Sequence, residues 1–196
     1  MKEQDKDTFV AAIAGMMWAP SLASAHPAIF HHFTMASGLL HPLTGLDHVL
    51  AMTSVGLWAS QKGGRALWVW PSAFVGVMLV GGALGMQGVA LPMVEPMIAV
   101  SVLVLGLLIA SATRLPLWAG AALVGLFALA HGNAHGLEAP ETGAGLQYAL
   151  GFAFSTVALH GIGIALGRAS DQRRWTKIIR TSGVVAAGVG AMMFFV

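Results

Sequence analysis

The stretch HPLTGLDHVLAM, which begins at His41 and ends at Met52, places two histidines, a proline and an aspartate inside an otherwise apolar segment. His41, Gly45, His48 and Met52 are separated by four, three and four residues. This spacing puts side chains on one face of an α-helix. A carboxylate such as that of Asp47 costs about 2.5–3.5 kcal/mol to insert into hydrocarbon, so it needs a partner or a function there.

Pro42 gives two ways to build the first helix. We expect a helix from Pro42 to Ser60, because a proline in the first helical turn loses no hydrogen bond. Residues 30–41 would then lie at the membrane surface before the helix. The alternative is one longer helix that is kinked at Pro42. In either case Asp47 is rotated about 100° from its neighbour His48, so it either ligates an ion directly or orients an imidazole.

The composition indicates a membrane protein. The chain has 196 residues, of which 57% are hydrophobic and only 9% are charged, whereas soluble domains carry about 25% charged residues. Cysteine is absent, which excludes a disulfide framework and a thiolate metal site. We therefore expect an all-α membrane protein without a soluble domain.

The first 25 residues are typical of a secretory signal peptide. Lys2 and Lys6 precede an apolar run over residues 9–18, and the sequence Ala-Ser-Ala ends at Ala25. This order fits a cleavage site with small residues, so we predict a signal peptide over residues 1–25. An uncleaved membrane anchor is the alternative. Cleavage would leave His26 at the mature N-terminus, where its α-amine and its imidazole together offer two ligands to a metal ion.

Residues 26–196 form the predicted transporter domain, which contains six apolar segments of spanning length. Their approximate limits are 35–60, 66–86, 96–113, 115–134, 146–167 and 179–196. Glycines recur throughout these segments, and small residues allow close packing of helices in lipid. A homo-oligomer is compatible with this pattern.

The basic residues predict the orientation of the spans. If the N-terminus is secreted, every Lys and Arg of the mature chain lies on the same side of the membrane. These residues are Lys62, Arg65, Arg114, Arg168, Arg173, Arg174, Lys177 and Arg180. Cytoplasmic loops carry such an excess of Lys and Arg. We therefore expect a multi-pass protein of the bacterial inner membrane, with the mature N-terminus and the C-terminus on the periplasmic side.

The candidate metal ligands all fall on the outer side or at mid-depth in this topology. They are His26, His41, Asp47, His48, Glu95, His131, His135, Glu138 and His160. In the stretch HGNAHGLE, two histidines and a glutamate share one face if the helix persists through two glycines. Imidazole with carboxylate suits Ni²⁺, Co²⁺, Zn²⁺, Fe²⁺ or Cu²⁺, and ligand type alone does not separate these ions. No nucleotide-binding motif is present, so the chain is not expected to be an ATP-driven pump.

Several of these motifs resemble the HupE/UreJ family of nickel permeases. The first is HPLTGLDHVLAM, read as H-P-x-x-G-x-D-H; the others are VEPMIAVSVLVLGLLIA (94–110), HGNAHGLE (131–138) and YALGFAFSTVALHGIGI (148–164). The resemblance covers nearly the whole mature chain. It implies a secondary transporter that moves Ni²⁺ inward to supply hydrogenase or urease maturation. It also implies that His41, Asp47 and His48 handle the ion, together with the polar residues of the second histidine motif.

Two other functions remain as alternatives. An intramembrane zinc hydrolase would use His and Asp ligands and an open water position, but the residues offer no clear separate general base. A metal sensor that does not transport is the third option. We therefore expect a permease and not an enzyme, with a divalent metal ion and membrane lipid as its partners and neither a catalytic cofactor nor a nucleic acid.

Overall fold

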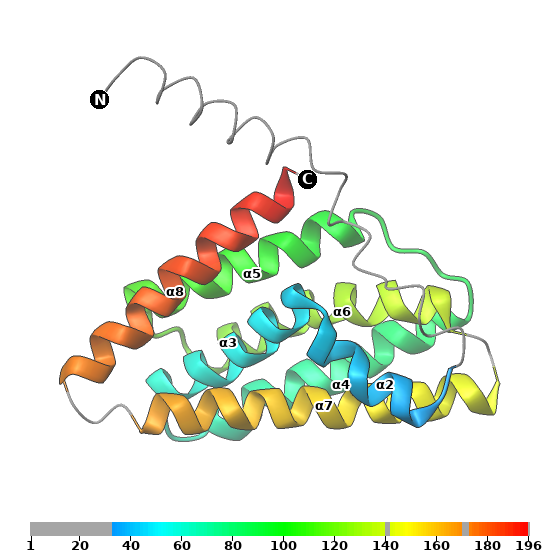
Figure 1. Ribbon diagram of the computed structural model, residues 1–196, viewed down its shortest axis with the longest axis horizontal. Coiled ribbons are helices and arrows are strands. Elements are labelled where there is room, and N and C mark those ends of the chain that lie inside the picture. The colour runs from blue at the N-terminus through cyan, green and yellow to red at the C-terminus, as the bar shows by residue number, and fades with distance from the viewer. Residues whose placement is uncertain (1–32, 140–141, 170–172, 196) are drawn as a thin grey trace, which may run out of the picture. The chain divides into compact units, whose positions relative to one another are not determined.

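The computed structural model describes residues 33–139, 142–169 and 173–195, and these residues form seven helices without a strand. The helices are α2 (Met35–Thr44), α3 (Leu46–Lys62), α4 (Ala66–Met86), α5 (Val94–Ser111), α6 (Leu117–Glu138), α7 (Gly143–Arg168) and α8 (Arg173–Phe194). Figure 1 shows them as long rods joined by short connections. The all-α prediction is confirmed for this part of the chain. The predicted signal peptide and His26 lie outside the described residues.

Four described helices are long and apolar enough to cross a membrane, namely α4, α5, α6 and α7. Their limits agree with the predicted segments to within a few residues, and α4 coincides with the predicted span 66–86. The first predicted span is divided, which leaves α3 with 17 residues. All four Lys and Arg residues of α8 lie in its first eight residues. The count of six spans therefore stays a prediction.

The motif around Pro42 folds differently from both sequence-based expectations. The helix begins at Met35, because Thr34 and Ser37 form a capping box in which each side chain bonds the other's backbone N–H. Pro42 lies inside α2, and the chain breaks at Gly45, whose backbone is extended. The predicted helix start at Pro42 is therefore wrong, and so is the single helical stripe. The strong local cap at Thr34 outweighs the missing N–H of proline.

The long helices pack in pairs, and glycines set how closely they approach. In the α4–α6 pair, a Cβ added at Gly132 would collide with the carbonyl oxygen of Met78. In the α3–α7 pair, one added at Gly56 would collide with the carbonyl oxygen of His160. Within each of these pairs the helices run in the same direction. This is expected because both helices of a pair are even-numbered spans or both are odd-numbered spans, and such spans cross the membrane in the same direction. α5 packs against α8.

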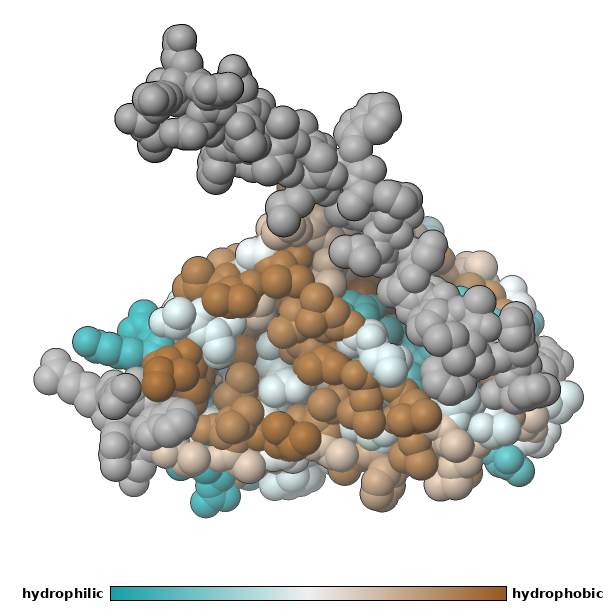
Figure 2. Space-filling model, viewed as in Figure 1, coloured by the Kyte–Doolittle hydropathy of each residue, from teal (hydrophilic) through white to brown (hydrophobic). Residues whose placement is uncertain are grey.

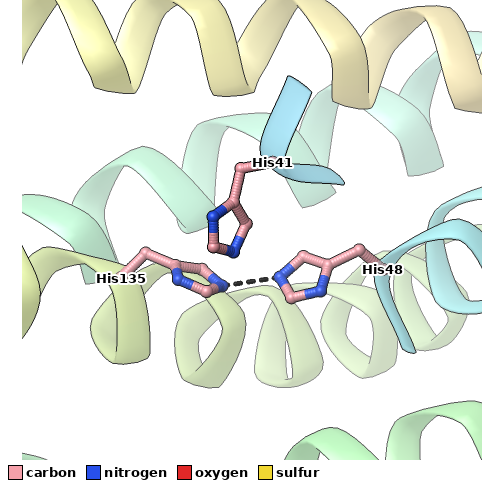
Figure 3. A group of neighbouring side chains, drawn as sticks. All are labelled: His41, His48 and His135. Carbon is pink, nitrogen blue, oxygen red and sulfur yellow. Dashed lines mark hydrogen bonds between the residues drawn. The ribbon is translucent and has the colours of Figure 1, made fainter. Parts of the chain in front are cut away.

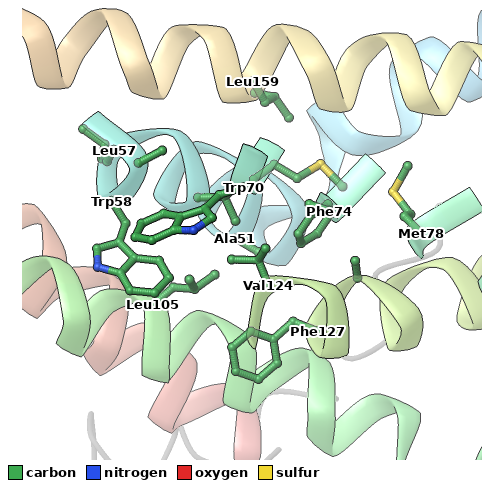
Figure 4. Close-up of a cluster of buried hydrophobic side chains, with 14 of the residues drawn as sticks. Ala51, Leu57, Trp58, Trp70, Phe74, Met78, Leu105, Val124, Phe127 and Leu159 are labelled. Atoms are coloured by element: carbon green, nitrogen blue, oxygen red, sulfur yellow. The ribbon is translucent and has the colours of Figure 1, made fainter. Parts of the chain in front are cut away.

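The apolar core lies between α3, α4, α5 and α6 and extends to α7, from which Figure 4 shows Leu159. Trp58 and Trp70 stack there with ring centroids 4.1 Å apart. Their indole N–H groups donate to the carbonyl oxygens of Thr113 and Leu117, at 2.8 and 2.9 Å. Both acceptors lie next to or inside the connection between α5 and α6. These bonds fix the ends of four helices on the side that the basic residues mark as cytoplasmic.

Large apolar side chains cover the outside of the described helices. Trp118, Phe154 and Val184 are each more than half exposed. Figure 2 shows hydrophobic residues over much of the visible face. A soluble monomer rarely exposes a continuous apolar surface of this kind, whereas lipid accepts it without cost. The surface therefore agrees with the membrane composition read from the sequence.

Candidate metal centre

Three histidines from three helices converge at one point. His41 lies in the last turn of α2, His48 in the first turn of α3 and His135 in the last turn of α6. One ring nitrogen from each lies within 4.8 Å of the other two. Figure 3 shows the three rings facing each other, with the Nε2 atoms of His48 and His135 2.6 Å apart. Imidazoles that bind one ion at about 2.0–2.1 Å keep their nitrogens roughly 3 Å apart, so a small outward shift would admit an ion.

The break at Gly45 creates this convergence. If α2 and α3 were one continuous helix, the side chains of His41 and His48 would lie on the same helix face. They would be separated along that face and would not turn toward each other. The extended residue turns the chain so that the two rings meet edge to face, with centroids 5.5 Å apart. The ring of His41 also contacts that of His135 at 4.4 Å. A discontinuous helix of this kind is a common source of ion sites in membrane transporters.

The side chain of Asp47 contacts that of His48. Its Oδ1 atom lies 2.8 Å from Nδ1 of His48, while the opposite ring nitrogen of His48 faces His135. A carboxylate on one imidazole nitrogen fixes the tautomer and makes the other nitrogen a better ligand. Gly45 makes room for this pair, because an added Cβ would lie 2.8 Å from both of the atoms in contact. Of the two roles left open for Asp47, the geometry favours orientation.

His131 lies one helical turn from His135 and supplies a fourth imidazole. Its ring centroid is 5.2 Å from that of His48, and the residue is fully buried. The hydroxyl of Ser101 donates to the carbonyl oxygen of Ile98 at 2.6 Å, so it accepts the N–H at Nε2 of His131 over 3.0 Å. This arrangement leaves Nδ1 of His131 as a buried lone pair without a hydrogen-bond partner. Ser101 was not predicted from the sequence, although a single hydroxyl group in an apolar span could have indicated a functional residue.

Of the remaining described candidate ligands, Glu138 lies at the edge of the three converging rings, whereas Glu95 and His160 are not among the neighbouring ligand atoms. Glu138 is half exposed, with Oε2 3.9 Å from Nδ1 of His135, and the helix does persist through Gly132 and Gly136 to reach it. Glu95 is exposed in the first turn of α5. His160 is buried in α7 against Phe74 and is not in the group of neighbouring ligand atoms.

Aromatic side chains that the sequence did not single out enclose the site. The ring of Phe152 in α7 contacts all three converging histidines, with centroid distances of 5.0 to 5.7 Å. Tyr148, one turn earlier, contacts His41 at 5.9 Å. Both are buried. Such a shell keeps bulk water away, which strengthens the electrostatic interactions inside it.

A cavity adjoins the histidines between α4, α6 and α7. Its volume is about 380 Å³, and its wall includes His131, His135, Tyr148 and Phe152. Most of the other lining residues are apolar. A water molecule takes up about 30 Å³ in the liquid, so the space holds several waters or an ion with part of its hydration shell.

The helix ends favour a cation at this site. The C-terminal end of a helix carries a partial negative charge, which stabilises positive charge near its last turn. Both α2 and α6 end beside the histidines, since His41 and His135 occupy their last turns. Asp47 adds a full negative charge next to His48. The N-terminus of α3 beside His48 carries the opposite partial charge, which the carboxylate of Asp47 offsets. Neutral imidazoles, two helix C-termini and one carboxylate together suit a divalent cation.

The fold and this site define the class as helical membrane proteins with a buried histidine cluster. The chain matches the model of the HupE / UreJ protein family over residues 14–193, and it therefore belongs to that family. It is 45% identical over 193 residues, 98% of each chain, to a protein of Rhizobium leguminosarum bv. viciae that is named Protein HupE. No solved structure matches the chain. The resemblance inferred from the sequence motifs is confirmed, and with four helices of membrane length the chain is a multi-pass membrane protein.

Proposed function

We propose that this protein is a permease that moves a divalent transition metal ion, Ni²⁺ foremost, inward across the membrane. The observation that carries the proposal is the convergence of His41, His48 and His135 from three separate helices. Membership of the HupE / UreJ family supports it. Imidazole ligands also accept Co²⁺, Zn²⁺ and Cu²⁺, so the choice of Ni²⁺ rests on the resemblance to nickel permeases.

The proposed path begins at the outer ends of the helices. The carboxylates of Glu95 and Glu138 are exposed there, and they attract a cation. The three converging histidines then exchange part of its hydration shell for imidazole nitrogens. His131 takes the ion one turn further inward with its free lone pair, and His160 lies deeper still. His26 would join the outer capture step if the signal peptide is removed.

Uptake of ⁶³Ni²⁺ into proteoliposomes that contain the full chain tests this function. Variants His41→Ala and His48→Ala should lower the initial uptake rate by more than about tenfold, since even residues that only orient a ligand cost 10–100-fold. Asp47→Asn should lower it less, because the amide oxygen still accepts a hydrogen bond from His48. Leu43→Ala is the matched control, because Leu43 is half exposed on the same helix as His41.

The same experiment separates the permease from the zinc hydrolase. Three histidines and an open position are also a catalytic zinc set. Two carboxylates approach these histidines: Asp47 is engaged with His48 at 2.8 Å, and Glu138 lies 3.9 Å from His135. Purified protein that holds one zinc ion per chain while its proteoliposomes take up no divalent ion would favour the hydrolase. Unchanged uptake by the double variant His41→Ala/His48→Ala would refute the proposed site.

A further inference from the structure

His160 is a buried imidazole that the described structure leaves without hydrogen bonds. Only 1% of its surface is exposed, and neither Nδ1 nor Nε2 has a partner. An unmet polar atom in the interior costs about 1–3 kcal/mol, so such a residue is retained for a reason other than stability. No other titratable side chain is in ring or hydrogen-bond contact with it in the part of the chain that the structure describes.

His160 lies well below the converging histidines. Its carbonyl oxygen meets Gly56 of α3, where an added Cβ would collide with it. Gly56 follows His48 by eight residues in the same helix, which corresponds to about 12 Å along the axis. The chain therefore holds two separate levels of imidazole, one at the ends of α2 and α6 and one near the middle of the bundle.

The side chain of Phe74 contacts a histidine of each level. Its ring centroid is 5.8 Å from that of His131 and 5.2 Å from that of His160. The contact with His160 is edge to face, at an interplanar angle of 85°. Phe74 is fully buried in α4, within the core drawn in Figure 4. It is thus the one described aromatic residue whose ring contacts a histidine of each level.

Both neighbours of this ring carry unused nitrogen atoms. Nδ1 of His131 and both ring nitrogens of His160 have no hydrogen-bond partner. A core that only needed packing would favour apolar side chains at these places, because those leave no polar atom unmet. Two imidazoles with unpaired nitrogens in contact with one phenyl ring instead suit a pair of ion ligands beside an apolar constriction. Apolar constrictions close ion pathways by excluding water.

We propose that Phe74 is the gate between an outer histidine station, completed by His131, and an inner station at His160. This proposal rests on the proposed transport function. In this proposal the present arrangement is the closed state, in which the ring is in contact with both histidines. Rotation of the ring away from His131 opens it, and the ion exchanges the Nδ1 ligand of His131 for a ring nitrogen of His160.

The test uses proteoliposomes that contain the full chain and are preloaded with ⁶³NiCl₂. After dilution into metal-free buffer, Phe74→Ala should release the ion about tenfold faster than wild type, which corresponds to about 1.4 kcal/mol of barrier. Its equilibrium binding of Ni²⁺ in detergent should stay within about twofold of wild type, because the converging histidines are untouched. His160→Ala should slow uptake about tenfold with the same unchanged binding.

Phe127→Ala is the matched control. Phe127 belongs to the same buried cluster, but among the described residues no ring contact joins it to a histidine. It therefore reproduces the loss of a core phenyl ring without opening a passage. Phe74→Leu keeps the core filled if alanine prevents folding, and it should give an intermediate release rate.

Equal release rates for Phe74→Ala and Phe127→Ala, or for Phe74→Leu and wild type, would overturn the gate while leaving the transport function intact. A wild-type protein that moves no Ni²⁺ in either direction would overturn the transport function and the gate together. Weakened equilibrium binding in His160→Ala would show that His160 supports the outer site and is not a separate station.

Discussion

Gly45 is the residue on which the metal centre depends most directly, although it binds nothing. It interrupts the helix between two histidines, and its missing side chain leaves space for the contact between Asp47 and His48. The extended conformation of its backbone is open to other residues, so the need for glycine comes from this space. Gly45 therefore affects the site in two ways: it interrupts the helix, and it allows the contact that orients the imidazole of His48.

Gly45→Ala should therefore weaken metal binding without unfolding the protein. The added methyl group would push Asp47 or His48 out of contact, and the loss of an orienting partner lowers metal affinity by about 10–100-fold. Equilibrium binding of ⁶³Ni²⁺ to the detergent-solubilised protein measures this effect. Gly161→Ala serves as the control, because an added Cβ there meets nothing within 4 Å. Equal affinities for both variants would show that the Asp47–His48 contact does not govern binding.

At the scale of helices, the position of His131 and His135 depends on how α6 packs against α4. Gly132 and Gly136 face the backbone of α4, where added Cβ atoms would collide with the carbonyl oxygens of Met78 and Gly82. Between them, Asn133 is fully buried and bonds the loop after α4, through the carbonyl oxygen of Val89 and the N–H of Leu91. These contacts hold the histidine-bearing turn of α6 in register with α4.

Gly132→Ala should separate α4 from α6 and lower the thermal stability of the protein. Overfilling a well-packed contact typically costs about 1–3 kcal/mol. Gly125→Ala, about two turns earlier in the same helix, is the matched comparison, because its added Cβ would lie 3.5 Å from Val77, an ordinary contact distance. Alanine is the better helix former by up to about 1 kcal/mol, so Gly125→Ala should be neutral or stabilising. Thermal unfolding in detergent, followed by circular dichroism, distinguishes the two, and equal melting temperatures would contradict the packing role.

At the scale of the whole molecule, the basic residues and the contact between α8 and α5 both concern the orientation of the protein in the membrane. The side chain of Arg180 in α8 bonds the carbonyl oxygen of Ala110 at the end of α5 over 2.7 Å. A cation at a helix C-terminus is favourable, and this end is the one that the basic residues predict to face the cytoplasm. The metal centre lies at the other ends of the helices. A protein in this orientation would receive its ion from the outer side.

The absence of cysteine makes the orientation directly testable. Single cysteines at Ala90 and Ser111 flank α5, and both residues are exposed. A membrane-impermeant maleimide should label Ala90→Cys in intact spheroplasts and should label Ser111→Cys only after permeabilisation. The cysteine-free parent chain reports the background. The opposite labelling pattern would reverse the topology and would place the histidine cluster on the cytoplasmic side.

The sequence by itself determined the membrane class, the limits of α4 to α7 and the residue types of the metal centre. Long apolar runs can satisfy their backbone only as helices in lipid, so local composition is sufficient for these features. It also determined the family, through motifs such as HPLTGLDH and HGNAHGLE. The persistence of α6 through Gly132 and Gly136 agreed with the spacing of its histidines.

Only the tertiary structure decided how these residues meet. The capping box at Thr34 and the break at Gly45 moved Pro42 into a helix interior, and packing of α2 and α3 on α7 brought His41 toward His135. Glu95 stayed exposed, and the ring of Phe74 came into contact with both His131 and His160. Such contacts join residues far apart in the chain, and a spacing rule reports only neighbours within one helix. Whether a histidine faces other histidines or a phenyl ring is therefore set by packing between helices.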